Sequence, residues 1–403
     1  MTTSHVSDAP TFARDRRVHF WVTVKGFSDA GDVAWTIALA WTAVQIATPA
    51  IAGLVVAAGA FPRAVVLLVG GVVADRFETF RVMRLVTVVR IAVLLATIAG
   101  IQIAGASVPL LLTVAVAFGV CDAVFDPAAA TLGRQLVHER DLTAYAGAAQ
   151  TASRLGTMLG AALGGGLVAL GGLSAAALAN AVTYAVVLLV LAVVLVARFP
   201  LSRTATEPVL RSIGAGFGYL RRDRAARVLV LTLSGLNLAV APALGIGLAL
   251  RVQAGEWGPQ ALGLLEALVG LGAVGGAAVA MRWNPHRATW IGFLLLLCQG
   301  LAIVLLAAPE LATTVFACLV IGFTAGSASA LLSAAFVRTV APDFLGRISS
   351  IRQLSDDLLM PAAMAGFGVV AGGASLTTAF AIFGGAMTAL MIVTATSQRP
   401  TRM

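Results

Sequence analysis

Long apolar runs without a charged residue dominate this 403-residue chain. A helix needs about 20 apolar residues to cross a membrane, so several of the runs are long enough for two spans. The charge-free runs are residues 33–62, 91–121, 155–197, 228–250, 288–309, 311–337 and 358–398. Turn-forming residues interrupt the longer runs, and we expect tight hairpins at Thr48-Pro49, Gly105–Pro109, Gly171–Ser174 and Gly372–Ser375.

This pattern predicts an all-α integral membrane protein with twelve transmembrane helices. Each apolar run is extended into flanking segments that contain only single charges, and the longer runs are divided at the Gly and Pro breaks. The expected spans are residues 18–46, 50–74, 82–104, 109–132, 142–170, 174–198, 226–250, 258–281, 288–308, 311–337, 347–371 and 375–396.

Positively charged side chains gather in alternate connections between these spans. Because Arg and Lys are retained on the cytoplasmic side, this distribution predicts that both termini are cytoplasmic. The opposite connections hold only Arg251, Glu256 and Glu310 as charged residues. The N-terminus is polar until Val18, so we expect no cleavable signal peptide.

The longest polar stretch, residues 199–225, separates two halves of six expected spans each. The sequence at 142–154 weakly resembles the sequence at 345–357, which indicates a parallel repeat. Two such bundles are a transporter design with the substrate site near the membrane midplane. The expected parts are a cytoplasmic tail at 1–17, six-helix bundles at 18–198 and 226–396, a central cytoplasmic loop at 199–225 and a tail at 397–403.

The composition indicates lipid rather than water as the surroundings. Charged residues make up 11% of the chain, against about 25% in a soluble domain, and 59% of the residues are hydrophobic. So few charges exclude a soluble enzyme, a nucleic-acid-binding module and a disordered chain. The formal net charge of +9 therefore does not indicate a nucleic-acid partner.

We expect no cofactor and no metal. The three Cys and four His are scattered without ligand spacing, and no phosphate-binding Gly-xxxx-Gly-Lys-Ser/Thr run occurs. A membrane enzyme would need clustered His, Ser, Lys or metal ligands at one interface, so we do not expect an enzyme. A receptor would add a soluble domain, for which the chain has no length.

Charged residues within the spans are the candidate functional residues, because a charge at the bilayer centre costs about 3 kcal/mol. Asp32 lies in the first span, three residues after Asp29 and on the same helix face. We interpret Asp32 as the carboxylate that couples proton entry to transport, with Arg63 of the second span as its counter-charge. The alternative is a fixed Asp32–Arg63 ion pair that only holds the two spans together.

Further candidates for the central cavity or proton coupling are Asp122, Arg154 and Glu266. Asp122 shares one face of the fourth span with Asp126, four residues later, and we expect Asp126 to be a charge partner in a gate. Glu266 is alternatively an interfacial residue on a tilted helix. Arg90 also lies in a span, and the pattern assigns it no role.

Two adjacent carboxylates, Asp356 and Asp357, lie at most three turns into the eleventh span. Basic residues precede them on the same expected helix. We expect these carboxylates to neutralise Arg352 or Arg347 rather than to take part in transport.

The connection between the second and third spans contains a Gly, three residues, Asp-Arg and a later Arg. This pattern resembles the signature loop of the major facilitator superfamily, although Glu78-Thr79 replaces its second Gly-Arg pair. The resemblance implies a cytoplasmic gate whose arginines bridge to a carboxylate such as Asp126. Its expected members are Gly71, Asp75, Arg76, Arg81, Asp126 and Arg347.

Glycines at regular spacing in the fifth span resemble the antiporter motif of drug exporters, with Ala161 in place of the usual Pro. Small residues at this spacing let helices approach closely. The motif glycines are Gly156, Gly160, Gly164 and Gly165.

Four short segments extend the resemblance over nearly the whole chain. They are Ser28–Asp32, Phe125–Ala128, Phe217–Arg224 and Leu345–Ser349. The combination is similar to the twelve-span drug:proton antiporter branch, which includes macrolide-efflux-like proteins and enterobactin-type siderophore exporters. The resemblance implies export of a small amphipathic or hydrophobic compound (a drug, siderophore or secondary metabolite) in exchange for protons, by alternating access.

The alternative within the same fold is an uptake symporter or facilitator. A cavity for a polar sugar would need more Asn, Gln and aromatic residues than these spans hold. The expected partners are a small-molecule substrate, protons and the lipid bilayer, and we expect a monomer. Arg far outnumbers the single Lys, Lys25, which suggests a GC-rich bacterial genome and hence a bacterial inner (plasma) membrane.

Overall fold

The computed structural model describes residues 10–69, 78–199, 209–282, 285 and 287–397, and all regular structure in these residues is helical. The longer helices are α1 (Arg16–Ile46), α2 (Pro49–Val69), α4 (Thr79–Ala104), α5 (Val108–Leu136), α6 (Leu142–Leu189), α8 (Arg224–Pro242), α10 (Gly258–Arg282), α11 (Ala288–Leu305), α12 (Leu311–Thr339), α13 (Pro342–Gly373) and α14 (Leu376–Ser397). Shorter elements are η1 (Phe12–Arg14), η2 (Glu139–Asp141), η3 (Val190–Val194), α7 (Val209–Arg222), η4 (Ala243–Gly247) and α9 (Leu248–Ala254). The expected all-α class is confirmed for these residues.

The breaks expected from Gly and Pro lie where helices end. α1 ends at Ile46 and α2 begins at Pro49, a position where the missing proline N–H leaves no hydrogen bond unmade. Gly105 follows α4 with a φ of 77°. Inside α6 the helical geometry is interrupted at Gly171 and Gly172, and Gly172 has a φ of 61°, which favours glycine. The two parts of α6 thus correspond to two expected spans.

Nine helices in the described part of the chain are long and apolar enough to cross a membrane. The segment Glu139–Val194 counts once among them, although the interruption in α6 divides it. The chain is therefore a multi-pass membrane protein, while the total of twelve spans and the cytoplasmic position of both termini stay predictions.

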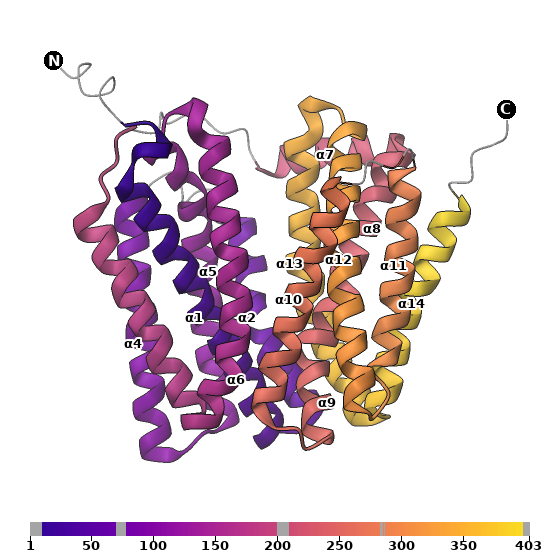
Figure 1. Cartoon of the computed structure of the whole chain (residues 1–403), viewed down its shortest axis with the longest axis horizontal. Helices are drawn as coiled ribbons and strands as arrows, with labels where there is room; N and C mark the ends of the chain where they lie inside the picture. The colour runs from indigo at the N-terminus through magenta and orange to yellow at the C-terminus, as the bar shows by residue number, and fades with distance from the viewer. Residues whose placement is uncertain (1–9, 70–77, 200–208, 283–284, 286, 398–403) are drawn as a thin grey trace. The chain divides into compact units, whose positions relative to one another are not determined.

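Contacts divide the chain into two compact units, which we call unit 1 (residues 1–42 and 61–205) and unit 2 (residues 43–60 and 206–403). Within each unit the long helices run alongside one another (Figure 1). The division passes through α2, whose first residues belong to unit 2.

A buried apolar cluster joins α1, α4, α5 and α6 in unit 1. Large side chains from all four helices interlock there, and such close packing fixes the relative positions of the helices. Members with little or no exposed surface include Trp21, Met83, Phe125, Leu132 and Leu191. This packing holds the polar residues of the same helices in place.

Asp15 ties the start of α1 to the end of the α6 segment. Its Oδ1 accepts hydrogen bonds from the backbone N–H of Arg17 (3.1 Å) and Val18 (3.3 Å), in the manner of a helix cap. Its Oδ2 forms an ion pair with Arg198. Burial alone raises the pKa of the Asp15 carboxyl, but the bonds from Arg198 and Val18 outweigh burial, so the pKa lies below its usual range.

This arrangement predicts an acid-sensitive contribution to the stability of unit 1. Because the pKa of Asp15 is lower in the folded than in the unfolded chain, the stabilisation is complete above about pH 4 and is lost as the pH falls through the folded-state value. Asp15→Asn should lower the free energy of unfolding by about 1–3 kcal/mol at pH 7 and by less at pH 3. Thermal midpoints in detergent at both values measure this, and an equal loss at both would contradict it.

Unit 2 contains a closely packed helix pair, α10 and α12. A Cβ added at Gly272 would lie 2.6 Å from the carbonyl oxygen of Leu319, which shows that the two backbones touch. The hydroxyl of Ser327 on α12 donates a hydrogen bond of 2.9 Å to the carbonyl oxygen of Gly276 on α10. Small residues permit this approach, as is common between membrane helices.

Candidate functional site

Asp32 is held by two side chains of α6 in unit 1. Its carboxylate is partly buried, and its Oδ1 accepts a hydrogen bond of 3.2 Å from Nδ2 of Asn180. The hydroxyl of Tyr184 donates a second hydrogen bond to the same oxygen. Asn180 and Tyr184 have 0% and 1% of their surface exposed, so both donors are fixed by packing. Thr183 donates a further bond of 3.0 Å to Oδ1 of Asn180 and helps to orient its amide.

An ion pair lies next to Tyr184. Arg90 of α4, with 4% of its surface exposed, pairs with Asp122 of α5. The guanidinium carbon of Arg90 lies 4.4 Å from the ring centre of Phe125 and 5.2 Å from that of Tyr184. The aromatic faces stabilise the buried cation, since their π-systems attract positive charge.

These residues form one polar network, which we call the Asp32 network. It consists of Asp32, Arg90, Asp122, Asn180 and Tyr184. It holds two carboxylates and one guanidinium among apolar helices, where charges are expensive unless paired. Such a network can take up or release one proton at a carboxylate while hydrogen-bond donors compensate the change.

The expected pairing of Asp32 with Arg63 stays a prediction. The side chain of Arg63 lies outside the described residues, and the described partners of Asp32 are Asn180 and Tyr184. Asp29, which shares a helix face with Asp32, pairs instead with Lys25 one turn earlier. Position on one helix face therefore did not give the two carboxylates a common partner.

Sequence reasoning missed three members of the Asp32 network as site residues. Arg90 was visible as a charge inside an apolar span, and Asn180 as one of few amides in the spans. Tyr184 is one of only three tyrosines. Their rarity was a usable signal, but their partners lie far away in the sequence.

The other two coupling candidates have no described contact with this network. Arg154 is exposed on α6 and forms no ion pair with a described residue. Glu266 is partly exposed on α10 of unit 2, and no described residue forms a hydrogen bond with it. Their roles in transport stay predictions.

The gate residues are described only in part. Gly71, Asp75 and Arg76 lie outside the described residues. Nε of Arg81 lies 2.8 Å from Oε2 of Glu78, and both side chains are largely exposed. Glu78 lies three positions before Arg81 and within local reach. The expected bridge from the gate arginines to a carboxylate such as Asp126 stays a prediction.

Two further gate residues are described in separate units. Asp126 is partly buried on α5 of unit 1. The guanidinium carbon of Arg347 on α13 of unit 2 lies 5.6 Å from the ring centre of Phe344. Their roles in a gate stay predictions.

The antiporter-like glycines form the surface of α6 that packs on α1. Gly156, Gly160, Gly164 and Gly165 are all buried. A Cβ at Gly160 would lie 2.6 Å from Cα of Ala30, and one at Gly164 would lie 2.8 Å from Cα of Ala34. These contacts bring α6 close to the α1 turns on either side of Asp32.

Gly160→Ala should therefore destabilise unit 1 by about 1–3 kcal/mol, because backbone atoms of α1 would have to move. Gly166→Ala is the matched control on the same helix, since its Cβ would meet no atom within 4 Å. We expect the control to be neutral or slightly stabilising. Thermal midpoints of both purified variants in detergent measure the difference, and equal midpoints would contradict this account of the motif.

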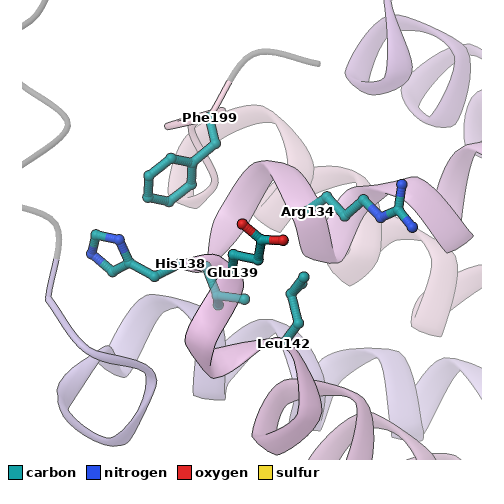
Figure 2. Close-up of a pocket in the computed structure, with 6 residues that line it drawn as sticks. Arg134, His138, Glu139, Leu142 and Phe199 are labelled. Atoms are coloured by element: carbon teal, nitrogen blue, oxygen red, sulfur yellow. The ribbon is translucent and has the colours of Figure 1, made fainter. Parts of the chain in front are cut away.

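The structure contains a pocket of about 540 Å³ at one end of unit 1. Figure 2 shows the Glu139 side chain between Arg134 and Phe199. The lining residues are Arg134, Val137, His138, Glu139, Leu142 and Phe199. Because Arg134 and Glu139 are exposed at the helix ends, this pocket is separate from the Asp32 network.

Unit 2 contains an apolar groove of about 440 Å³ between α8, α13 and α14. Nearby, Asp356 accepts hydrogen bonds from Asn237 (2.9 Å) and Arg352 (3.4 Å), while Asp357 accepts one from Gln353 (3.1 Å). The expected neutralisation of Arg352 is confirmed for Asp356.

Long apolar helices that enclose paired charges define a multi-pass membrane protein with a buried polar site. The family model described as Major Facilitator Superfamily matches residues 26–364. The chain belongs to this superfamily, as its signature loop suggested. No curated protein matches the chain in sequence.

Solved structures support the same fold at low sequence identity. A mutant of the nucleoside transporter NupG is 12% identical with a TM-score of 0.78, covering 95% of this chain and 100% of that one. A POT family transporter in complex with a thioalcohol-conjugated peptide is 13% identical, with a TM-score of 0.73 and coverages of 96% and 98%. A bacterial homologue of the human lysosomal transporter Spinster, inward-facing and unoccupied, is 14% identical, with a TM-score of 0.67 and coverages of 98% and 96%.

Proposed function

We propose that this transporter exports a small amphipathic or hydrophobic compound across a bacterial inner membrane in exchange for protons. The observation that carries the proposal is the Asp32 carboxylate, held by Asn180 and Tyr184 inside a membrane bundle. An ionisable group within a membrane helix is a functional candidate by default. The antiporter-like glycines of α6 add support, because they pack closely on α1, the helix that carries Asp32.

Proton uptake at Asp32 changes its hydrogen bonding. The ionised carboxylate accepts bonds from the Tyr184 hydroxyl and the Asn180 amide. The protonated carboxyl has lost its negative charge, so both charge-assisted bonds become weaker, and its O–H adds a hydrogen-bond donor. Since the carboxylate lies on α1 and both donors on α6, protonation alters the connection between two helices.

Alternating access then converts this local change into transport. Substrate enters from the cytoplasm or inner leaflet, and a proton from outside loads Asp32. Moving one charge through 100 mV is worth about 2.3 kcal/mol, which is enough to bias the exchange between two conformations. In this scheme the loop with Gly71, Asp75 and Arg76 closes the cytoplasmic side, together with Asp126 and Arg347, and Glu266 is a second candidate proton carrier.

Uptake by a symporter or facilitator of the same fold is the second candidate. The similar solved structures include a nucleoside transporter and a POT family transporter with a peptide conjugate bound. Because their identities to this chain are low, they support the transporter fold for either direction.

The test is substrate-triggered proton flux in proteoliposomes with a pH-sensitive dye inside. A pH gradient is imposed, and lipophilic drugs and siderophores are added one at a time, with protein-free liposomes as the control. We expect at least one compound to trigger proton flux in liposomes that contain the protein and not in protein-free liposomes. If no compound does so, the uptake alternative predicts a different result. Labelled compounds would then move in the same direction as the protons, as in a symporter, or down their own concentration gradient, as in a facilitator.

A further inference from the structure

The amphipathic helix α7 (Val209–Arg222) directly precedes a membrane-spanning helix. Only Asp223 separates it from α8, which starts at Arg224. Figure 1 shows α7 running across the end of the unit 2 bundle rather than along the long helices. A helix of 14 residues is about 21 Å long. Because α7 leads directly into the apolar helix α8, its end lies near the level where a bilayer changes from acyl chains to headgroups.

One side of α7 is fixed to the start of α13. The ring of Tyr219 stacks on Phe344 with a centroid distance of 4.6 Å, and its hydroxyl accepts a bond of 3.3 Å from the N–H of Ala341. Leu220 is buried, with 7% of its surface exposed. Nη1 of Arg227 on α8 donates to the carbonyl oxygen of Arg221 at 3.2 Å, so the end of α7 is anchored as well.

The remaining described side chains of α7 form a cationic, partly apolar surface. Arg221 and Arg222 are exposed, and Phe217 has 50% of its surface exposed. Asp223 is the only acidic residue in 209–227, and its carboxylate already accepts hydrogen bonds from other residues. It caps α8 through the N–H of Ala226 (3.0 Å) and accepts a bond of 3.1 Å from Tyr219.

We propose that Phe217, Arg221 and Arg222 form a binding surface for the headgroups of anionic phospholipids. Guanidinium groups bind phosphate oxygens by paired, charge-assisted hydrogen bonds. An exposed Phe beside them fits the boundary between headgroups and acyl chains, where amphipathic helices insert their apolar side. Because Tyr219 and Leu220 hold α7 in place, the surface is already formed before a lipid binds.

This inference goes beyond the proposed function and does not depend on it. It concerns the lipid partner of unit 2, not the transported compound or the proton. A chain that exports nothing by proton exchange would still have this surface. Its test therefore uses lipid binding without a gradient or a substrate.

The experiment counts lipids bound to the purified full-length protein by native mass spectrometry. The protein in neutral detergent is titrated with phosphatidylglycerol or with phosphatidylcholine of the same acyl chains. Each Arg near an anionic surface contributes about 1 kcal/mol, so Arg221→Gln/Arg222→Gln should weaken the tightest phosphatidylglycerol binding about 25-fold. Phosphatidylcholine binding should not change, and the loss should shrink in high salt.

Two controls separate position from total charge and from misfolding. Arg134→Gln/Arg140→Gln removes the same charge from exposed positions of unit 1 and should change the affinity less than about threefold. Arg221→Lys/Arg222→Lys keeps the charge and should restore most of the binding. Unchanged thermal midpoints show that the variants fold. Equal binding of both lipids by the wild type, or equal losses in both Gln pairs, would overturn the proposal.

Discussion

Asp32→Asn should reduce substrate-driven proton flux in proteoliposomes by about 100-fold or more, because a positioned proton-transfer group contributes at least that factor. The amide has the shape of the carboxyl but cannot take up a proton. Its oxygen can still accept the hydrogen bonds that Asn180 and Tyr184 donate to Asp32. The variant should therefore fold with a thermal midpoint close to that of the wild type and still bind substrate.

Asp29→Asn is the matched control for this experiment. Asp29 lies one turn earlier on α1 and pairs with Lys25, so its removal changes the same charge outside the Asp32 network. We expect the control to retain most of the flux. Flux that survives in Asp32→Asn would move the proton site to Asp122 or Glu266, and loss in both variants would indicate a general charge effect.

The local features of the fold could be predicted from the sequence because they depend on neighbouring residues. Hydropathy located the long helices, and the φ of Gly172 shows why a glycine pair divides α6. The spacing of Gly160 and Gly164 predicted a close helix contact, and both glycines do pack against another backbone. Each of these inferences needed only one stretch of chain.

The partners of the charged residues could not be predicted in the same way. Asp32 and Asn180 are 148 positions apart, and only the packing of α1 on α6 brings them together. The sequence suggested Arg63 of the second span as the counter-charge, and its side chain lies outside the described residues. Arg81 shows the opposite case, since its described partner, Glu78, lies only three positions away.

The ion pair between Arg90 and Asp122 predicts an unequal effect of removing either charge. Arg90 has 5% of its side chain exposed and Asp122 has 38%, so Asp122→Asn leaves the more deeply buried charge alone. We expect this variant to lose about 3 kcal/mol of stability. Arg90→Met should cost less, since the remaining carboxylate is partly exposed. The double variant should be more stable than Asp122→Asn, because both charges are removed and no unpaired charge stays buried.

Thermal midpoints of the wild type, both single variants and the double variant in detergent give the coupling between the two side chains. We expect a coupling of about 1–3 kcal/mol, as for other contacting charges in one network. Glu78→Gln and Arg81→Gln provide the control cycle, because that pair is 57% and 82% exposed and should show a coupling near zero. If the two cycles gave the same coupling, Arg90 would not depend on Asp122 for its charge balance. The aromatic faces of Phe125 and Tyr184 would then be sufficient to hold the buried guanidinium.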